Sequence, residues 1–370
     1  MMKKFNIICV AGTRPNFTKI SSILRALTSN SKINPLLIHT GQHHDFSMSQ
    51  SFFDELGISS PHVYLDAGSG SHAVITADIM KKFEVVLHNN NPSAVLVVGD
   101  VNSTLACALV AAKEQVPVIH VEAGLRSYDR KMPEEINRVL TDQISDLLFT
   151  TEKSAIQNLQ RENIDLKRIH FVGNVMIDTL KYNLERAVPA DETLKTLNFP
   201  SGSDAYGLLT LHRASNVDDP KILKDLLGAI VEISKTLPVI FPLHPRTKER
   251  VKQFSFEYLF NNSKIFVTEP LSYLKMLGLM AKAKLVLTDS GGIQEETTAL
   301  GIPCFTLREN TERPITITEG TNTLVGISQE VILSEFSKFI ETGGKVGRIP
   351  ELWDGNAAER VCQHIVNWLI

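Results

Sequence analysis

The sequence predicts an α/β protein with two doubly wound domains, each a parallel sheet covered by helices on both faces. Two observations lead to this prediction. Apolar segments with strand character alternate with segments of helical period along most of the chain, as in βαβ units. The alternation weakens after about residue 184 and restarts at Tyr206, and 370 residues exceed what one core usually holds. We therefore expect two domains that face a shared cleft.

The first domain is expected to span residues 1–185. Strands are predicted at 6–10, 35–39, 94–98, 116–121, 147–150 and 169–172, because these runs are short, apolar and rich in Val, Ile and Leu. Amphipathic stretches between them predict helices at 17–27, 73–87, 104–113 and 134–144. Strands that are joined by helical crossovers lie parallel in one sheet.

The second domain is expected to span residues 186–355. It should begin with a linker and an exposed element at 186–204, where prolines, charges and a Ser-Gly pair interrupt the pattern. Strands are then predicted at 206–211, 239–243, 264–267 and 285–287, and helices at 220–237, 272–283 and 293–300. A last segment, 356–370, is expected to form a terminal helix that ends on apolar residues.

Composition excludes several classes of partner. The formal net charge is −3, so no overall basic field is present to hold nucleic acid or an anionic membrane. No apolar run approaches the roughly 18 residues that a membrane helix needs, and the N-terminal apolar run ends at Gly12 without a cleavage signal, which favours a first strand. The four scattered cysteines indicate buried free thiols in a reducing, cytoplasmic setting: Cys9, Cys107, Cys304 and Cys362.

Two loops have the composition of anion-binding turns. The first, residues 12–16, follows the first strand and opens a helix, and Arg14 and Lys19 can both lean toward one anion there. The second, residues 288–292, follows the strand 285–287 and offers Ser290 together with the backbone N–H groups of Gly291 and Gly292. Neither loop fits a dinucleotide fingerprint or a P-loop. One such loop in each domain suggests a nucleoside diphosphate bound across the cleft.

Acidic residues gather at the end of the first predicted sheet where the strands finish. Asp100 follows the strand 94–98, Glu122 follows the strand 116–121, and Glu134 lies at the start of the next helix. Each alone is compatible with a helix cap or a surface charge. Together they predict an acid–base site, because carboxylates in a closed site can differ in pKa and so accept and donate protons.

Histidines of the second domain follow two of its strands. His212 and His244 stand where a side chain can contact a phosphate, although single histidines are more often structural. His43 and His44 are adjacent in a loop, and no H-x-H or H-E-x-x-H spacing occurs, so we expect no metal site. Glu295 and Glu296, predicted in the first turn of the helix 293–300, are candidates for capping it or for binding a ribose.

Taken together, these motifs resemble the UDP-N-acetylglucosamine 2-epimerase family, of the non-hydrolysing type. The resemblance extends over roughly residues 12 to 325. It is carried, in the family's order, by Gly12-Thr13-Arg14-Pro15, Gln42-His43, Gly99-Asp100, His120–Arg126, Pro133–Arg138, Gly173-Asn174, His212-Arg213, Thr288–Glu296 and Thr311-Glu312-Arg313-Pro314.

The resemblance implies a fold and a reaction. The fold is that of two Rossmann-like domains, like the glycosyltransferase-B enzymes, with the C-terminal helix crossing back to the first domain. The reaction inverts carbon 2 of UDP-N-acetylglucosamine, by anti elimination of UDP to 2-acetamidoglucal and re-addition of UDP. No oxidation occurs, so no cofactor is required. The resemblance also implies a homodimer, formed through helices of the first domain.

The same resemblance implies roles for individual residues. Asp100, Glu122 and Glu134 supply the acid and the base, although the sequence leaves open which is which. The remaining roles are phosphate binding by Ser290, Gly291 and Gly292, ribose binding by Glu296, sugar contacts by Arg138, Asn174 and Arg313, and stabilisation of the leaving diphosphate by Arg14, Lys19 and His212, with His244 as a further phosphate contact.

Two segments depart from the family pattern. Many bacterial members read His-Arg-Arg-Glu where this chain has His212-Arg213-Ala214-Ser215, and Gln-His-Arg where it has Gln42-His43-His44. These positions border a second substrate site in regulated members, so allosteric activation is not implied here. Both segments look like those of members that act on UDP-diacetamido-uronic acids, whereas Thr311–Pro314 looks like the N-acetylglucosamine enzymes.

Three other functions stay open at this point. A hydrolysing relative would release N-acetylmannosamine and UDP. A retaining glycosyltransferase would share the architecture but would need an acceptor pocket, and it would not need three acids in the first domain. A catalytically inactive nucleotide-sugar sensor would not need Asp100, Glu122, Glu134 and His212 together.

Overall fold

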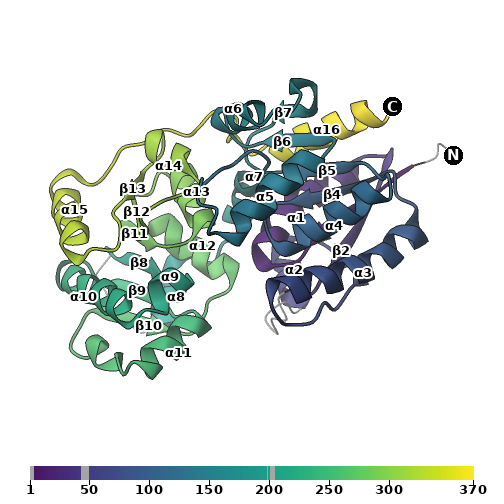
Figure 1. Cartoon of the computed structure of the whole chain (residues 1–370). Helices are drawn as coiled ribbons and strands as arrows, with labels where there is room; N and C mark the ends of the chain where they lie inside the picture. The colour runs from purple at the N-terminus through teal and green to yellow at the C-terminus, as the bar shows by residue number, and fades with distance from the viewer. Residues whose placement is uncertain (1–3, 43–49, 198, 201–204) are drawn as a thin grey trace. The chain divides into compact units, whose positions relative to one another are not determined.

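The computed structural model describes residues 4–42, 50–197, 199–200 and 205–370, so His43 and His44 lie outside it. The chain divides into two compact units, residues 1–181 with 351–370 and residues 182–350. Each unit contains one parallel sheet with helices on both of its faces (Figure 1). Both sheets, and the return of the last helix to the first unit, confirm the predicted fold class.

The first unit has a seven-stranded sheet in the order β3-β2-β1-β4-β5-β6-β7. Its strands are β1 Phe5–Ala11, β2 Ile33–His39, β3 Val63–Tyr64, β4 Ala94–Val98, β5 Val118–Val121, β6 Leu147–Thr150 and β7 Ile169–Phe171. Its helices are α1 Arg14–Ser29, α2 Gln50–Leu56, α3 His72–Asn90, α4 Asn102–Lys113, α5 Pro133–Ile144, α6 Lys153–Arg161, α7 Val175–Leu184 and α16 Ala357–Leu369, with a 3-10 turn at Leu166–Arg168.

Alternate residues of the first sheet supply two cores. Ile8 and Val10 of β1 pack with Phe83 of α3 and Cys107 of α4 on one face. The other face is covered by α1 and α16, which contact each other. Helix α16 is fixed at its start by Asp178 of α7, whose carboxylate accepts hydrogen bonds from the backbone N–H groups that open the helix.

The second unit has a six-stranded sheet in the order β10-β9-β8-β11-β12-β13. Its strands are β8 Gly207–Thr210, β9 Val239–Pro242, β10 Ile265–Thr268, β11 Leu285–Thr288, β12 Cys304–Thr306 and β13 Asn322–Leu324. Its helices are α8 Ala190–Thr196, α9 Ala214–Val217, α10 Pro220–Thr236, α11 Pro245–Gln253, α12 Tyr273–Lys282, α13 Gly291–Leu300, α14 Pro314–Thr318 and α15 Gln329–Thr342, with a 3-10 turn at Glu257–Phe260.

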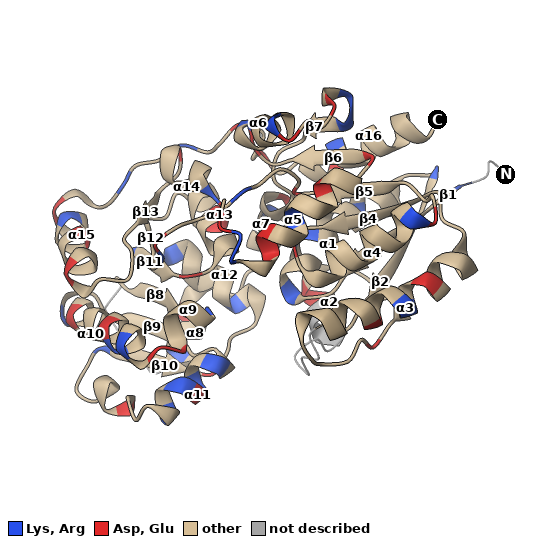
Figure 2. Cartoon of the chain, viewed as in Figure 1, with Lys and Arg blue, Asp and Glu red and all other residues tan. Residues whose placement is uncertain are grey.

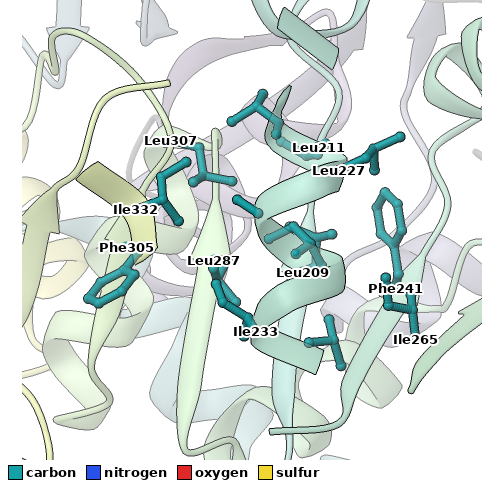
Figure 3. Close-up of a cluster of buried hydrophobic side chains, with 14 of the residues drawn as sticks. Leu209, Leu211, Leu227, Ile233, Phe241, Ile265, Leu287, Phe305, Leu307 and Ile332 are labelled. Carbon is teal, nitrogen blue, oxygen red and sulfur yellow. The ribbon is translucent and has the colours of Figure 1, made fainter. Parts of the chain in front are cut away.

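The core of the second unit is one large apolar cluster between its sheet and helices α10 and α15 (Figure 3). Leu209 and Leu287 of the central strands pack with Ile233 of α10, and Ile332 of α15 closes the cluster beside Phe305. Burial of this cluster removes apolar area from water at about 25 cal/mol per Å², which holds the second sheet rigid beneath its loops.

The prediction of a linker with an exposed element at 186–204 is correct in part for the described residues: Arg186, Asp191, Glu192, Lys195 and Thr196 are exposed, but the segment also packs against α12. Helix α8 lies there, Ala190 and Thr193 are buried, and the Val188 backbone N–H donates to Leu274 O over 3.2 Å. Phe199 packs edge-on against Tyr206, with ring centroids 5.9 Å apart. The prolines and charged residues of this segment therefore flank or lie within a helix that packs on one side.

All four cysteines are buried free thiols, as predicted. Within the described ranges, no helix is both long and apolar enough to cross a membrane.

Candidate functional site

The order of the first sheet directs attention to the loops after β1 and β4. The chain leaves β1 toward β2 on one side and β4 toward β5 on the other, and open sheets of this kind bind ligands where the connections diverge. Asn16 joins the two loops: its amide donates to Val98 O over 3.1 Å, and its Oδ1 accepts from the Thr13 backbone N–H over 3.2 Å. A Cβ at Gly12 would overlap Ser103 Oγ, so glycine is required there.

Lys19 and Glu122 form an ion pair at this end of the sheet. Lys19 Nζ lies 2.8 Å from both carboxylate oxygens of Glu122, and the two side chains are 9% and 1% exposed. Glu122 directly follows β5 and has φ +73°, a left-handed conformation that turns its side chain back over the strand ends. The pairing of Lys19 with Glu122 is a contact that the sequence analysis did not anticipate.

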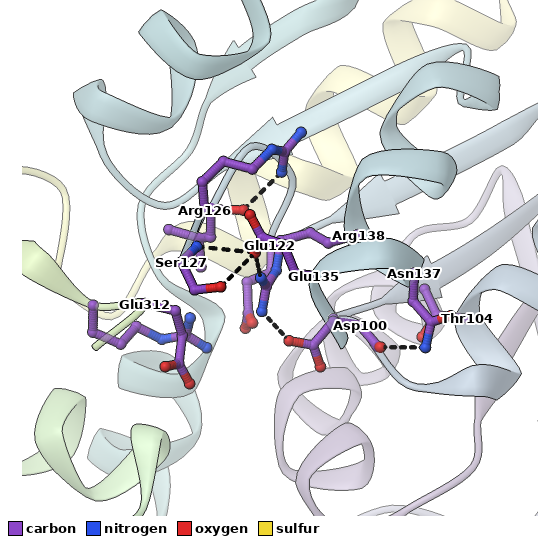
Figure 4. A network of polar contacts seen from close by, with 12 residues as sticks. Asp100, Thr104, Glu122, Arg126, Ser127, Glu135, Asn137, Arg138 and Glu312 are labelled. Carbon is purple, nitrogen blue, oxygen red and sulfur yellow. Dashed lines mark hydrogen bonds and ion pairs between the residues drawn. The ribbon is translucent and has the colours of Figure 1, made fainter. Parts of the chain in front are cut away.

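Arg138 of α5 connects two further carboxylates. It forms ion pairs with Asp100 and with Glu135, the latter at 2.6 Å (Figure 4). Glu135 also accepts from the backbone N–H and the hydroxyl of Ser127, each over 2.9 Å. The guanidinium is 1% exposed at its side chain, so its charge is balanced almost entirely by these two acids.

The other predicted residues of the first unit lie at the same strand ends. Glu134 is half-buried in the first turn of α5 and has no hydrogen bond or ion pair with the residues that the structure describes. Arg14 is half-buried at the first position of α1. Asn174 follows β7, is fully buried, and its Oδ1 accepts from the Met176 backbone N–H over 2.9 Å.

In the second unit the equivalent loops follow β8 and β11. His212 Nδ1 lies 2.9 Å from Asp289 Oδ1, and Asp289 Oδ2 accepts from the backbone N–H groups of His212 and Arg213 over 3.0 and 2.9 Å. Burial opposes the charge on Asp289, but these donors hold its pKa below the ordinary range. Asp289 therefore fixes the orientation of the His212 ring. The His212 side chain is still 40% exposed to solvent.

Ser290, Gly291 and Gly292 form the start of α13. Ser290 is the N-cap residue and its side chain makes no capping bond, so the hydroxyl and the first N–H groups of the helix are available to an anion. The loop itself is held from below, because the Ser290 backbone N–H donates to Thr288 Oγ1 over 3.0 Å. A Cβ at Gly291 would lie 2.9 Å from Glu312 Oε1, so a larger residue would press on that carboxylate.

Glu312 is surrounded by arginines. Its carboxylate lies 2.9 Å from Arg308 Nη2 and 3.2 Å from Arg213 Nη2. Burial opposes the charged form, but the charges of Arg313, Arg308 and Arg213 hold the pKa of Glu312 well below its usual value. Arg313 in turn pairs with Glu295 at 2.8 Å, which orients the guanidinium that the sequence analysis assigned to the sugar.

Glu296 occupies a buried position on α13. Its Oε1 accepts from the Tyr273 hydroxyl over 2.7 Å. Burial raises the pKa of Glu296 to about 7, the Tyr273 hydrogen bond opposes this rise, and the charge of Glu295 adds to it. The prediction that Glu295 or Glu296 caps this helix is wrong, because α13 begins at Gly291 and both acids fall after its first turn.

His244 is the N-cap of α11, a helix whose surface carries Lys and Arg (Figure 2). Its Nδ1 accepts from the Arg246 backbone N–H over 3.2 Å, and its ring centroid lies 5.5 Å from that of His212. The two predicted histidines of the second unit are therefore brought together. The Nδ1 atoms of both rings are engaged by the protein, that of His212 by Asp289 and that of His244 by the Arg246 backbone N–H.

Three residues lie within the predicted motifs but have no role in the sequence prediction. Asn16, Glu135 and Asp289 hold other side chains in place, and each is an ordinary polar residue in a loop or a first helical turn. Their position directly after strands β1 and β11, or beside the predicted Glu134, was the one available hint. In the described ranges no group of three or more His, Cys, Asp or Glu side chains is arranged to hold a metal ion.

The chemistry open to these groups differs between the units. The first unit gathers four carboxylates, three of them paired with cations, which is suited to moving protons. The second unit offers a helix start, two histidines and a set of arginines, which is suited to binding phosphate and stabilising negative charge on a leaving group.

Comparisons with known proteins extend over both units. A family model described as UDP-N-acetylglucosamine 2-epimerase matches residues 25–366. The UDP-N-acetylglucosamine 2-epimerase of Methanocaldococcus jannaschii is 46% identical over 327 residues, which cover 88% of this chain and 89% of that protein. The UDP-2,3-diacetamido-2,3-dideoxy-D-glucuronate 2-epimerase of Pseudomonas aeruginosa is 39% identical over 366 residues, covering 97% and 99%.

A solved structure is similar over nearly the whole chain. The crystal structure of the M. jannaschii UDP-GlcNAc 2-epimerase in complex with UDP-GlcNAc and UDP has a TM-score of 0.89 at 43% sequence identity. The similarity covers 98% of this chain and 99% of that one.

Proposed function

Because this chain belongs to the UDP-N-acetylglucosamine 2-epimerase family, we propose that it interconverts UDP-N-acetylglucosamine and UDP-N-acetylmannosamine. The observation that carries the proposal is the pairing of two kinds of loop in one chain. In the first unit, carboxylates lie in the loops that follow the strands. In the second unit, the start of α13 and two histidines lie in the loops that follow the strands. The 46% identical relative from M. jannaschii bears the name of this activity.

The proposed mechanism starts at the second unit, which binds UDP. The start of α13, with Ser290, Gly291 and Gly292, holds the diphosphate through N–H groups and a hydroxyl. Glu296 accepts the ribose hydroxyls, and His212 and His244 contact the phosphates from the neighbouring loops. As the bond from carbon 1 to the diphosphate breaks, these donors stabilise the negative charge that develops on UDP.

The first unit supplies the proton transfers at carbon 2. One of Asp100, Glu122 and Glu134 removes the proton while UDP leaves in an anti elimination, which gives 2-acetamidoglucal. A second member of the set delivers a proton to the opposite face, and UDP adds again at carbon 1. Arg14 and Lys19 add positive charge beside these acids, and Arg138 and Asn174 orient the sugar. No group undergoes net oxidation, so the proposal needs no cofactor.

The test is NMR of the purified protein with UDP-N-acetylglucosamine in heavy water. We expect UDP-N-acetylmannosamine that carries deuterium at carbon 2, because the glucal takes its new proton from solvent-exchanged acids. Free N-acetylmannosamine with UDP indicates the hydrolysing reaction instead. Glu122→Gln should bind UDP with unchanged affinity and lose the carbon-2 exchange. An unchanged spectrum with the unmodified protein contradicts the proposed substrate.

A UDP-2,3-diacetamido-uronic acid is the second candidate substrate. The P. aeruginosa enzyme named for this sugar is 39% identical over almost the whole chain. Segments 41–45 and 211–215 of this chain also look similar to those of members that act on such sugars. The same experiment with the uronic acid sugar separates the two substrates. Faster carbon-2 exchange with the uronic acid sugar than with UDP-N-acetylglucosamine favours this alternative.

We also propose that the enzyme is a homodimer in the cytoplasm, assembled through helices of the first unit. Helices α3, α4 and α5 line a shallow groove of about 430 Å³, whose walls include Ala73, Met80 and Ile136. Large apolar side chains are exposed on the same helices, among them Val74 of α3, which is 56% exposed, and Leu140 of α5. Light scattering after size exclusion tests this: Val74→Asp with Ile136→Lys should convert a dimer to a monomer.

A further inference from the structure

Four ionisable side chains are linked in series beneath the loops of the first sheet, and we call them the Glu162–His120 network. Glu162, which ends α6, accepts from Arg126 Nε and Nη2 over 2.8 and 2.6 Å. Arg126 Nη2 also lies 2.6 Å from Asp142 Oδ2 in α5. Asp142 Oδ1 lies 2.7 Å from Nδ1 of His120 in β5. Only the Glu162 end reaches solvent, where its side chain is 26% exposed.

His120 has an acceptor on each ring nitrogen. Nδ1 faces Asp142, and Nε2 lies 2.8 Å from the backbone oxygen of Gly99. A carbonyl oxygen cannot donate, and the Asp142 carboxylate, whose Oδ2 accepts from Arg126 Nη2 and from the Gly124 backbone N–H, is ionised and has no proton to donate. Both contacts are hydrogen bonds only if both ring nitrogens carry protons. A neutral ring would set one nitrogen lone pair against an oxygen lone pair in a site with no water access, because His120 is 0% exposed.

The charges along the Glu162–His120 network alternate in sign when His120 is an imidazolium. Glu162 and Asp142 are negative, and Arg126 and His120 are positive. Burial disfavours the charge on Asp142, but the charges of His120 and Arg126 hold the pKa of that carboxyl below its ordinary value. Burial also disfavours the charge on Arg126, but the hydrogen bond to Glu162 and the charge of Asp142 hold the pKa of the guanidinium above its ordinary value.

His120 and Asp142, at the buried end of the Glu162–His120 network, each hold one backbone atom. Each of these atoms lies near a predicted catalytic acid. His120 donates to the oxygen of Gly99, the residue before Asp100. Asp142 Oδ2 accepts from the N–H of Gly124 over 3.1 Å, two residues after Glu122. Glu122 has φ +73°, a conformation that is strained for a residue with a side chain, so its turn depends on outside contacts to keep its shape.

We propose that both ring nitrogens of His120 donate hydrogen bonds, one to Asp142 and one to Gly99 O, and that His120 acts with Asp142 as a positioning residue, holding the turns that present Asp100 and Glu122. His120 itself is buried behind these turns and does not touch substrate. The catalytic part of this inference rests on the proposed epimerase function. The protonation state of His120 does not, because it follows from the hydrogen bonds alone.

The charge is tested by nitrogen NMR of the whole protein labelled with 15N-histidine. Both His120 nitrogens should show the shifts of an imidazolium, each with an attached proton. The signals are assigned by their loss in His120→Gln and, if that variant does not fold, by their displacement in Glu162→Gln at the exposed end of the chain. A pair of unequal shifts typical of a neutral ring overturns the proposal.

The positioning role is tested by steady-state kinetics and carbon-2 exchange. Glutamine at position 120 cannot donate to both oxygens, so His120→Gln should lower kcat about 100-fold, because small displacements of catalytic groups cost about that much. KM for the UDP-sugar and the affinity for UDP should change little, since the second unit is untouched. The matched control is His88→Gln, which removes an exposed histidine paired with Glu114 and should leave kcat unchanged.

The outcomes separate this inference from the proposed function. A folded His120→Gln protein with unchanged kcat overturns the positioning role, and so does a loss confined to KM. If the unmodified protein exchanges no carbon-2 proton with either UDP-sugar, the proposed function fails, and the nitrogen spectrum still decides whether His120 is charged.

Discussion

Lys19 and Glu122 form a buried ion pair although 103 residues of sequence separate them. Lys19 lies on α1, which follows β1, and Glu122 follows β5, so the lysine reaches past the end of β4 to meet the acid. Lys19 Nζ packs closely against the backbone at Gly99, because a Cβ there would lie only 3.0 Å from it. The first sheet therefore brings a cation and a candidate catalytic acid together where no local sequence pattern joins them.

Replacing Lys19 with methionine should destabilise the protein strongly. The variant keeps the packing of the side-chain stem but leaves Glu122 buried without this cation, and removing one partner of a buried pair costs about 3–5 kcal/mol. Denaturant unfolding of the first unit measures the loss. The matched control is Lys82→Met, because Lys82 pairs with Asp78 at 2.9 Å on the surface of α3. The control should lose less than about 1 kcal/mol, and equal losses in the two variants would contradict the prediction.

Gly12 is expected to be essential because the turn after β1 has no room for a side chain. An alanine Cβ would overlap Ser103 Oγ and lie 2.7 Å from Thr40 Oγ1, which are hydrogen-bonded to each other over 2.7 Å. Gly12→Ala should cost about 1–3 kcal/mol through overpacking. It should also abolish carbon-2 exchange, since the turn that carries Arg14 must move.

Gly343→Ala is the control for the glycine prediction. Gly343 has φ +78° and open space around its Cβ position, at the end of α15. The variant should lose about 1–2 kcal/mol from backbone strain alone and keep its activity. Thermal unfolding and the exchange assay on both variants separate stability from function, and retained exchange in Gly12→Ala would refute the assigned role of the turn.

Most of the fold could be predicted from the sequence because the long strands and helices are strongly patterned. The predicted strands 94–98 and 147–150 have the bounds of β4 and β6. The missed strands are short: β3 has two residues, and β12 and β13 have three each. Runs of this length carry no periodicity, and their strand conformation depends on the neighbours that they hydrogen-bond.

The candidate site could be predicted in outline but not in its pairings. The strand-end rule places Asp100, Glu122 and His212 correctly in the loops after β4, β5 and β8. The partners of these residues, such as Arg138 and Asp289, come from other parts of the chain. Pair formation depends on sheet order and on side-chain direction, and the alternation of strands and helices constrains neither.

Binding of the UDP-sugar should weaken below neutral pH because of Glu296. Burial raises the pKa of this carboxyl to about 7, and in the proposed binding mode its charged form is the acceptor for both ribose hydroxyls. The affinity for the UDP-sugar should therefore be highest above pH 7. Below pH 7 it should decrease, and the decrease should approach about tenfold for each pH unit. Calorimetry with UDP-N-acetylglucosamine on Glu122→Gln protein avoids turnover. In a Glu296→Gln background the affinity should be lower and independent of pH in this range, and a persisting pH dependence would exclude Glu296 as its source.

Asp178 should set how firmly the last helix is attached to the first unit. Its carboxylate accepts from the backbone N–H groups of Ala357 and Ala358 over 3.1 and 2.6 Å, so it caps α16 from α7. Asp178→Ala leaves both donors without this acceptor and should cost about 0.5–2 kcal/mol, as the loss of an N-cap does. The control is Asp219→Ala. Asp219 is the N-cap residue of α10 itself, so this variant removes a helix cap that does not connect two separate helices.

The pH dependence of the Asp178 variant identifies the carboxyl as the cause. Burial raises the pKa of Asp178 to about 6, and its hydrogen bonds from Ala358 and Ala357 oppose the rise. The folded state thus binds this proton more tightly than the unfolded state, whose pKa is near 3.9. As pH falls through 6, the unmodified protein gains stability from this group and Asp178→Ala does not. The difference in unfolding free energy between the two proteins should therefore widen between pH 7 and about pH 4, and a difference that narrows would show that the ionised carboxylate is the favoured form of this cap.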